Sequence, residues 1–171
     1  FLRNPAGRPR LPKKVPAWED HFVVPGQIVL KLSTGNYTFE MERGPEYKVV
    51  TGHFTINNFA DDTKQVEMER GADLAAEGWW SGDLDVHRSP KDIELVMQAE
   101  DLHVVPLITW GNEQSAWPPG GVPKEPLLRF DENRYCHLLG GRHVRPGGTF
   151  DYFNLSTPLR LGSPKAEYPP L

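Results

Sequence analysis

Residues 84–108 constrain the fold of this chain more than any other stretch, because they read as a strand, a helix and a second strand in direct succession. The first strand ends in Asp85 and His87, which point to one face because strand side chains alternate. A capping serine and a proline then begin a helix, which the apolar periodicity extends over 92–102. A strand over 104–108 completes a parallel βαβ unit. The polar side chains of this unit lie at the carboxyl end of its first strand, which is where ligands and active sites lie in open α/β sheets.

The motif Gly82-Asp83-Leu84-Asp85-Val86-His87 resembles the first metal-binding motif, Gly-Asp-Leu-His-Val-His, of the PHP-type metallohydrolases in their carbaryl-hydrolase-like CehA/McbA branch. The resemblance continues through 90–95, 100–104 and 108–110, and more weakly at 135–141 and 152–155. In that family, histidines at strand ends join further His, Asp and Glu side chains to hold two or three divalent metals. The resemblance therefore implies a PHP-like α/β segment over 72–171, and an intact site would hold a metal such as Zn or Mn.

Three departures from the family pattern predict that this metal site is eroded. Asp85 stands where the motif has its first histidine, which leaves His87 alone of the pair. The Thr-Asp-His expected after the second strand reads Thr109-Trp110-Gly111, and Arg142 replaces the bridging Glu. A cation there would repel a metal, and a tight catalytic site needs about three protein ligands. We therefore expect Asp85 and His87 to be a vestigial metal site, with His137 as an imidazole that could face His87 across the sheet.

The pattern of residues 23–71 predicts an antiparallel β-sandwich. Short, partly alternating segments between turn signals are expected to form its strands, at 28–32, 37–42, 53–56 and 64–69. The expected core contains four apolar side chains, Tyr37, Phe39, Phe54 and Ile56. The pattern over 35–40 resembles carboxypeptidase-regulatory and transthyretin-like sandwiches, which are accessory modules of secreted enzymes and surface proteins. That resemblance implies an extracellular or cell-surface location.

Residues 1–22 are basic and rich in proline. Because repeated prolines exclude a helix, we expect them to form an extended arm. Two interpretations remain for this arm: a disordered tail, or a segment that docks on a neighbouring molecule. Ordering it would require contacts that offset about 1–2 kcal/mol of backbone entropy per residue. Residues 110–125 form a long Gly/Pro loop that is either lid-like or a docking feature, and 166–171 form a proline-rich tail.

Four tryptophans flank the family-like segment: Trp79, Trp80, Trp110 and Trp117. They fit core packing, or alternatively a surface that binds a carbohydrate or a protein partner. Cys136 is the only cysteine, which excludes an internal disulfide. No motif activates this thiol, so we expect it to be buried and structural.

The charge and length of the chain restrict its function further. A net charge of -4 gives no electrostatic footprint for nucleic acid, and no apolar run reaches the ~18 residues of a membrane span. The chain has 171 residues, whereas a complete (β/α) barrel alone needs roughly 200 or more. The α/β segment is therefore expected to be an incomplete barrel.

The predicted fold class is mixed β and α/β, an antiparallel β-sandwich followed by an incomplete PHP-like βαβ piece. One functional hypothesis is a non-catalytic extracellular structural or interaction module without a cofactor. It would self-associate into a homo-oligomer or polymer through open sheet edges and extended ends. The alternative is the N-terminal fragment of a metal-dependent hydrolase, in which Asp85 substitutes for the lost histidine. A divalent metal would then activate water against a phosphoester or carbamate. The missing ligands favour the non-catalytic hypothesis.

Overall fold

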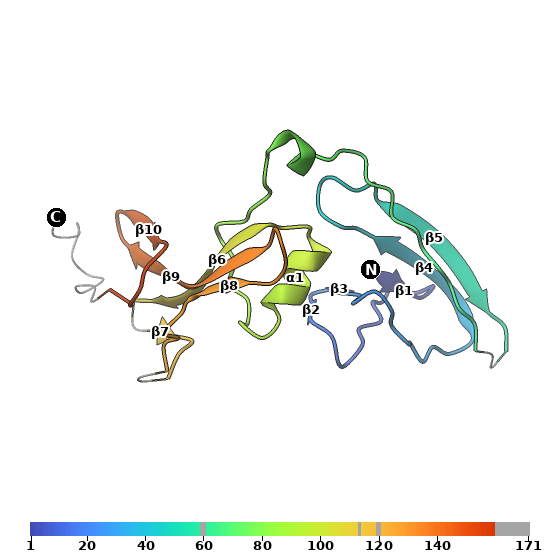
Figure 1. Ribbon diagram of the computed structural model, residues 1–171. Helices are drawn as coiled ribbons and strands as arrows, with labels where there is room; N and C mark the ends of the chain where they lie inside the picture. The colour runs from blue at the N-terminus through green and yellow to red at the C-terminus, as the bar shows by residue number, and fades with distance from the viewer. Residues whose placement is uncertain (59–60, 113, 119–120, 160–171) are drawn as a thin grey trace. The chain divides into compact units, whose positions relative to one another are not determined.

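The computed structural model describes residues 1–58, 61–112, 114–118 and 121–159, and its fold is mostly β (Figure 1). The chain forms two compact units. The first comprises Phe1–Trp79 together with Leu95–Asp101, and the second comprises Trp80–Glu94 together with Leu102–Leu171. The predicted proline-rich tail at 166–171 lies outside the described residues. No helix in the described ranges is long and apolar enough to cross a membrane.

The first unit is built on an antiparallel three-stranded sheet in the order β1-β4-β5. Its strands are β1 (Leu2–Arg3), β4 (Gly35–Met41) and β5 (Val50–Ile56). A separate two-stranded ribbon pairs β2 (Ala17–Trp18) with β3 (His21–Phe22), and a short 3-10 helix, η1, spans Ala75–Glu77. Glycine or proline stands between most of these short elements, and β2 and β3 are joined by Glu19 and Asp20.

One face of the β4–β5 pair carries the aromatic core that the alternation predicts. Tyr37 is 2% exposed and stacks on Phe54, with ring centroids 5.4 Å apart. Phe39 adds a tilted contact to the same ring at 6.4 Å. The Tyr37 hydroxyl donates to the carbonyl oxygen of Ser33 at 3.0 Å, which satisfies its polar end. Of the four predicted core residues, Tyr37 is therefore buried, whereas Phe39, Phe54 and Ile56 are only partly buried.

The predicted two-sheet sandwich is wrong in this segment, because two of its four strands are missing. Residues 28–32 have no regular structure, and 64–69 pair with nothing along most of their length. Only the end of segment 64–69 is held by backbone contacts. There the Lys48 N–H donates to the Glu69 carbonyl oxygen at 2.9 Å, and Tyr47 forms an isolated antiparallel β-bridge with the adjoining Arg70. Alternating side chains make a segment compatible with a strand, but a strand also needs a partner with free backbone groups.

The N-terminal arm is also corrected, because its first residues pair within their own chain. Leu2 lies opposite Phe39 across β1 and β4 and is 5% exposed. The Phe1 amino group donates to Glu40 O at 2.7 Å. The arm is extended as predicted, but the sheet edge that orders its start belongs to the same molecule.

A single arginine ties distant parts of the first unit together. Arg70 Nη1 lies 2.7 Å from Glu46 Oε2, and Arg70 Nη2 lies 2.7 Å from Asp101 Oδ2. The same guanidinium donates to the Tyr47 hydroxyl at 2.8 Å and covers its ring. Burial alone would lower the pKa of Arg70, but the hydrogen bonds that it donates to Asp101 and Tyr47, together with their charge, outweigh burial and raise the pKa, so the group stays charged.

The second unit is built on a mixed sheet in the order β10-β9-β6-β7, with β8 also paired to β9. The strands are β6 (Val104–Gly111), β7 (Gln114–Ser115), β8 (Leu127–Arg129), β9 (Tyr135–Arg145) and β10 (Gly148–Tyr152). β6 and β9 run parallel, and the remaining pairs are antiparallel. β6 and β9 are buried along most of their length, as central parallel strands usually are.

The predicted helix is present but shorter than expected, as α1 (Ile93–Ala99). It ends before Asp101, whose φ of 52° cannot continue a helix. Before it, Gly82 bridges Val104 and Val86 bridges Leu107, both in parallel. The predicted parallel connection through α1 therefore exists, although its first strand is reduced to two isolated bridges. Its likeness to a metallohydrolase barrel stays a prediction.

Candidate functional site

The candidate site lies in the second unit, where the end of the bridged segment meets the hairpin of β9 and β10. Val86 is buried and bonded to β6, and this places Asp85 and His87 on either side of it along the chain. Arg142 on β9 lies directly opposite Asp151 on β10 in the antiparallel register. Two separate parts of the unit therefore supply the polar side chains.

The guanidinium of Arg142 is the centre of this cluster. It holds Asp151 side-on, with Nε 2.8 Å from Oδ1 and Nη2 2.9 Å from Oδ2. Nη2 also lies 2.7 Å from Asp85 Oδ1, and Nη1 lies 3.1 Å from His87 Nε2. One cation thus contacts two carboxylates and one imidazole.

The imidazole nitrogen that faces the cluster is already engaged. His87 Nε2 lies 2.9 Å from Asp85 Oδ1 as well as 3.1 Å from Arg142 Nη1. A protonated Nε2 would donate to Asp85, and an unprotonated Nε2 would accept from Arg142. In neither form does this nitrogen offer a free lone pair to a metal.

The contacts between Arg142 and Asp151 favour the charged form of both side chains. Hydrogen bonding and charge from Arg142 lower the pKa of Asp151, with a smaller contribution from His87. The hydrogen bonds that Arg142 donates to Asp151 and then to Asp85 raise the pKa of Arg142 above its already high value. The pair of Arg142 and Asp151 is therefore ionised at neutral pH.

These residues do not fit the divalent metals that the family resemblance implies. The cation that the carboxylates bind is the guanidinium itself, and a metal there would face its repulsion. No group of three or more His, Cys, Asp or Glu side chains is placed to hold a metal anywhere in residues 1–58, 61–112, 114–118 and 121–159.

His137, the third predicted site residue, lies away from this network. It sits on β9 opposite Leu127 of β8, and its Nδ1 accepts from the backbone N–H of Leu139 at 3.3 Å. Burial lowers the pKa of His137, which favours a neutral ring. Within the described ranges no hydrogen bond or ring contact joins His137 to His87, so the structure does not bring the two imidazoles together.

The four tryptophans separate into packing and exposed positions. Trp110 is buried and stacks on Tyr152 at 6.0 Å, and Gly141 makes room for it, because a Cβ there would lie 2.2 Å from the indole ring. Trp117 donates through Nε1 to the Thr109 hydroxyl at 2.9 Å. Trp79 and Trp80 are instead 69% and 51% exposed. Trp79 and Trp80 are thus the most exposed of the four and present the largest surface to a carbohydrate or a protein partner.

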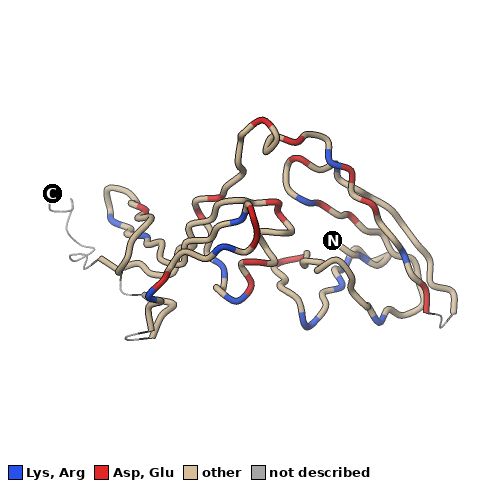
Figure 2. The backbone as a smooth tube through the Cα atoms, in the orientation of Figure 1, with Lys and Arg blue, Asp and Glu red and all other residues tan. Residues whose placement is uncertain are grey.

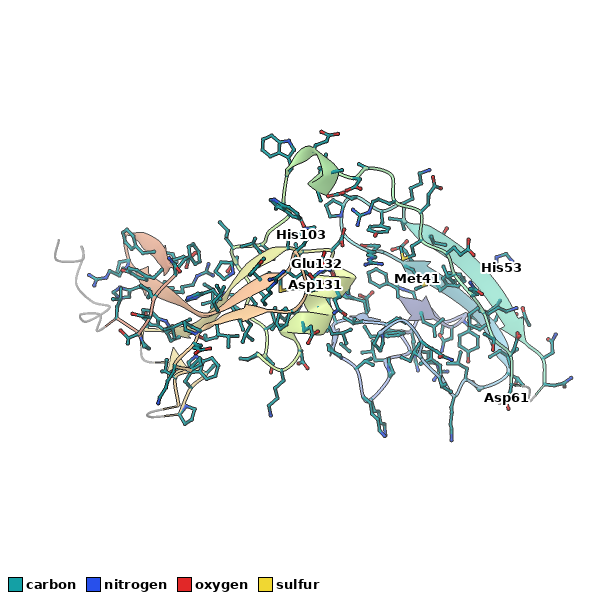
Figure 3. All side chains as sticks on the ribbon, in the orientation of Figure 1. Met41, His53, Asp61, His103, Asp131 and Glu132 are labelled. Carbon is teal, nitrogen blue, oxygen red and sulfur yellow. The ribbon has the colours of Figure 1, made fainter. Side chains whose placement is uncertain are left out.

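Two further residues with potentially reactive side chains, His103 and Cys136, are buried and make packing contacts instead of lining a site. His103, labelled in Figure 3, is buried, contacts the Ser81 hydroxyl through Nδ1 at 2.7 Å, and packs edge-on against Trp80 at 5.0 Å. Cys136 is fully buried on β9, as predicted, and burial raises the pKa of its thiol to about 12. A thiol with that pKa is not a nucleophile at neutral pH.

Sequence reasoning did not find Asp151, although the hairpin contains a usable signal. The two-residue turn Pro146-Gly147 follows an apolar and basic strand, and folding the chain back at this turn brings Asp151 opposite Arg142. Comparison of the chain with protein-family models, with curated proteins and with solved structures gives no match.

Proposed function

We propose that this chain is a non-catalytic interaction module that self-associates, and that Arg142 serves as a permanent internal cation in its metallohydrolase-like motif. The observation that carries this proposal is the guanidinium that contacts Asp85, His87 and Asp151 together. The expectation of an extracellular or cell-surface location comes from the resemblance over residues 35–40, and it stays a prediction.

The chemistry of arginine supports a structural role for this network. A guanidinium stays charged at every physiological pH and has no coordinated water to activate. A catalytic metal site keeps an open position for water or substrate, and here the groups that would hold the metal are bound to one another. The cluster fixes the bridged segment to the β9–β10 hairpin without supplying a nucleophile.

The hydrolase alternative retains one argument, the closeness of Asp85 and His87. Their 2.9 Å contact would suit two ligands of one metal if the guanidinium moved away. Metal analysis separates the two functions, because the alternative requires tight binding and the proposal does not.

The test is metal content after purification and dialysis against Zn²⁺ or Mn²⁺ at micromolar free concentration. We expect far less than one ion per chain. Arg142→Glu, which removes the competing cation and adds a carboxylate, should raise the Zn²⁺ content, whereas Lys91→Glu makes the same charge change on an exposed residue and should not. About one ion per wild-type chain, lost in His87→Ala, would refute the non-catalytic proposal.

A further inference from the structure

The first unit carries opposite charges on two separate segments. Residues 1–14 contain five Lys or Arg and no Asp or Glu, and we name them the basic segment. Residues 61–77 contain six Asp or Glu and two Lys or Arg, and we name them the acidic segment. The two net charges are opposite in sign and similar in size, +5 and, from six acids less two bases, -4.

The cations of the basic segment face solvent. Arg3 pairs with Asp20, and the other four, Arg8, Arg10, Lys13 and Lys14, are exposed. None of these four forms an ion pair with any residue that the structure describes. Lys13 and Lys14 stand in a turn, so their charges are presented without a packing role.

The acidic segment keeps an excess of negative charge because its cations are already committed. Arg70 turns inward to Glu46 and Asp101, and Lys64 Nζ lies 3.3 Å from Asp62 Oδ2. Asp61, Glu67 and Glu77 are exposed, and within the described ranges they form no ion pair. Unneutralised carboxylates therefore run along this segment.

The two segments do not neutralise each other within one molecule. Figure 2 shows the basic residues of the N-terminal segment toward the lower border of this unit and the acidic residues of 67–77 toward its upper border, whereas Asp61, labelled in Figure 3, lies low in this view. We infer that the basic segment of one copy binds the acidic segment of a second copy. The inference rests on the proposed self-association and names the surfaces that carry it.

The pairing of two different surfaces defines the geometry of the contact. We take it as heterologous, because the basic segment and the acidic residues of 67–77 lie toward opposite borders of the unit (Figure 2), so that one partner does not bind both at once; such contacts extend unless the rotation closes a ring. A polyanion such as DNA is a poorer partner for the basic segment, because the chain is net negative and the acidic segment lies on the same unit.

Charge reversal tests this contact without disturbing the sheet. Deleting the arm would remove buried Leu2, so two exposed positions in each segment are better targets. The arm variant carries Lys13→Glu and Lys14→Glu, and the acidic variant carries Glu67→Lys and Glu77→Lys. The control variant carries Lys91→Glu and Lys124→Glu, the same charge change as in the arm variant but on exposed residues of the other unit.

Light scattering and sedimentation of the full chain give the readout. At ~20 mM salt the wild type and the control should assemble, and ~300 mM salt should return both to monomer, because screening shortens the reach of exposed charges. Each segment variant alone should stay monomeric at ~20 mM salt. An equimolar mixture of the two should form a one-to-one dimer and nothing larger, since only one intact segment of each kind remains per pair.

Each contrary result identifies a different error. A wild type that is monomeric at every salt concentration would overturn both this contact and the proposed self-association. A wild type that assembles while both segment variants assemble equally well would overturn this contact alone. Binding of duplex DNA that requires Lys13 and Lys14, without self-association, would overturn it in favour of a polyanionic partner.

Discussion

Arg142 donates to both carboxylate oxygens of Asp151, and the two residues face each other directly across β9 and β10. Because this pairing lowers the pKa of Asp151 in the folded protein, the carboxylate contributes stability above the pH at which a free aspartate titrates. That contribution is lost as the pH falls through the lowered pKa. Asp151→Asn should therefore cost about 1 kcal/mol of unfolding free energy at pH 7 and progressively less below about pH 4.

Urea unfolding of Asp151→Asn and wild type at several pH values measures this difference. Asp62→Asn is the matched control, since Asp62 forms an exposed pair with Lys64 and its loss should change stability by a few tenths of a kcal/mol at most. A destabilisation of Asp151→Asn that persists undiminished at pH 3 would contradict an ionic origin.

Single residues could be assigned from sequence where the residue type alone decided the chemistry. Arg142 was identified as the cation that opposes a metal, and Cys136 as a buried thiol, without knowledge of their neighbours. Asp151 could not be assigned in this way, because its role depends on a hairpin register. His137 was given a possible partner on the opposite strand, but alternation fixes only the side of the sheet and not the neighbour across it.

Arg70 shows how one side chain can fix several elements at once. It pairs with Glu46 beyond the end of β4, with Tyr47 beside it, and with Asp101 just after α1. Glu46 and Asp101 are buried, so removing the guanidinium leaves two carboxylates with reduced compensation. Arg70→Ala should therefore lower the unfolding free energy by about 3 kcal/mol.

Arg70→Lys should recover only part of this loss, because a single ammonium cannot reproduce a planar fork that reaches two carboxylates. Lys48→Ala is the control, since its pair with Glu69 is exposed and should contribute about 0.5 kcal/mol or less. Chemical denaturation with far-UV circular dichroism gives all three values. Equal losses in Arg70→Ala and Lys48→Ala would show that Arg70 is only a surface charge.

Elements were predictable where their stabilising contacts are local or strongly apolar. The buried stretch that became β6, the periodic stretch that became α1 and the aromatic pair of β4 and β5 all have such signals. The segments 28–32 and 64–69 have similar alternation, yet the partner at β4 is supplied by Leu2–Arg3, more than thirty residues away in the chain. Strand pairing over that distance depends on the whole unit and leaves little trace in a short window of sequence.

At the scale of the whole molecule, the division into units departs from the sequence prediction. A boundary was expected at residue 71, but the first unit continues to Trp79 and also includes Leu95–Asp101. The ion pair between Arg70 and Asp101, separated by 31 residues, is one contact behind that grouping. Such long-range grouping has no signature in composition, because both sides of the boundary contain similar turns and charges.

The heterologous contact between basic and acidic segments makes a further prediction about the size of the assembly. A chain that adds one copy at each open end should show a broad range of sizes that grows with protein concentration, and not a single closed species.

The arm variant, Lys13→Glu with Lys14→Glu, keeps its acidic segment and can accept a wild-type arm, but it cannot donate one. A substoichiometric amount of it should therefore terminate growing chains and shift the wild-type sedimentation profile to smaller species. The control variant with Lys91→Glu and Lys124→Glu should join the chains without shortening them. A discrete dimer that neither grows with concentration nor shrinks on addition of the arm variant would contradict the head-to-tail contact.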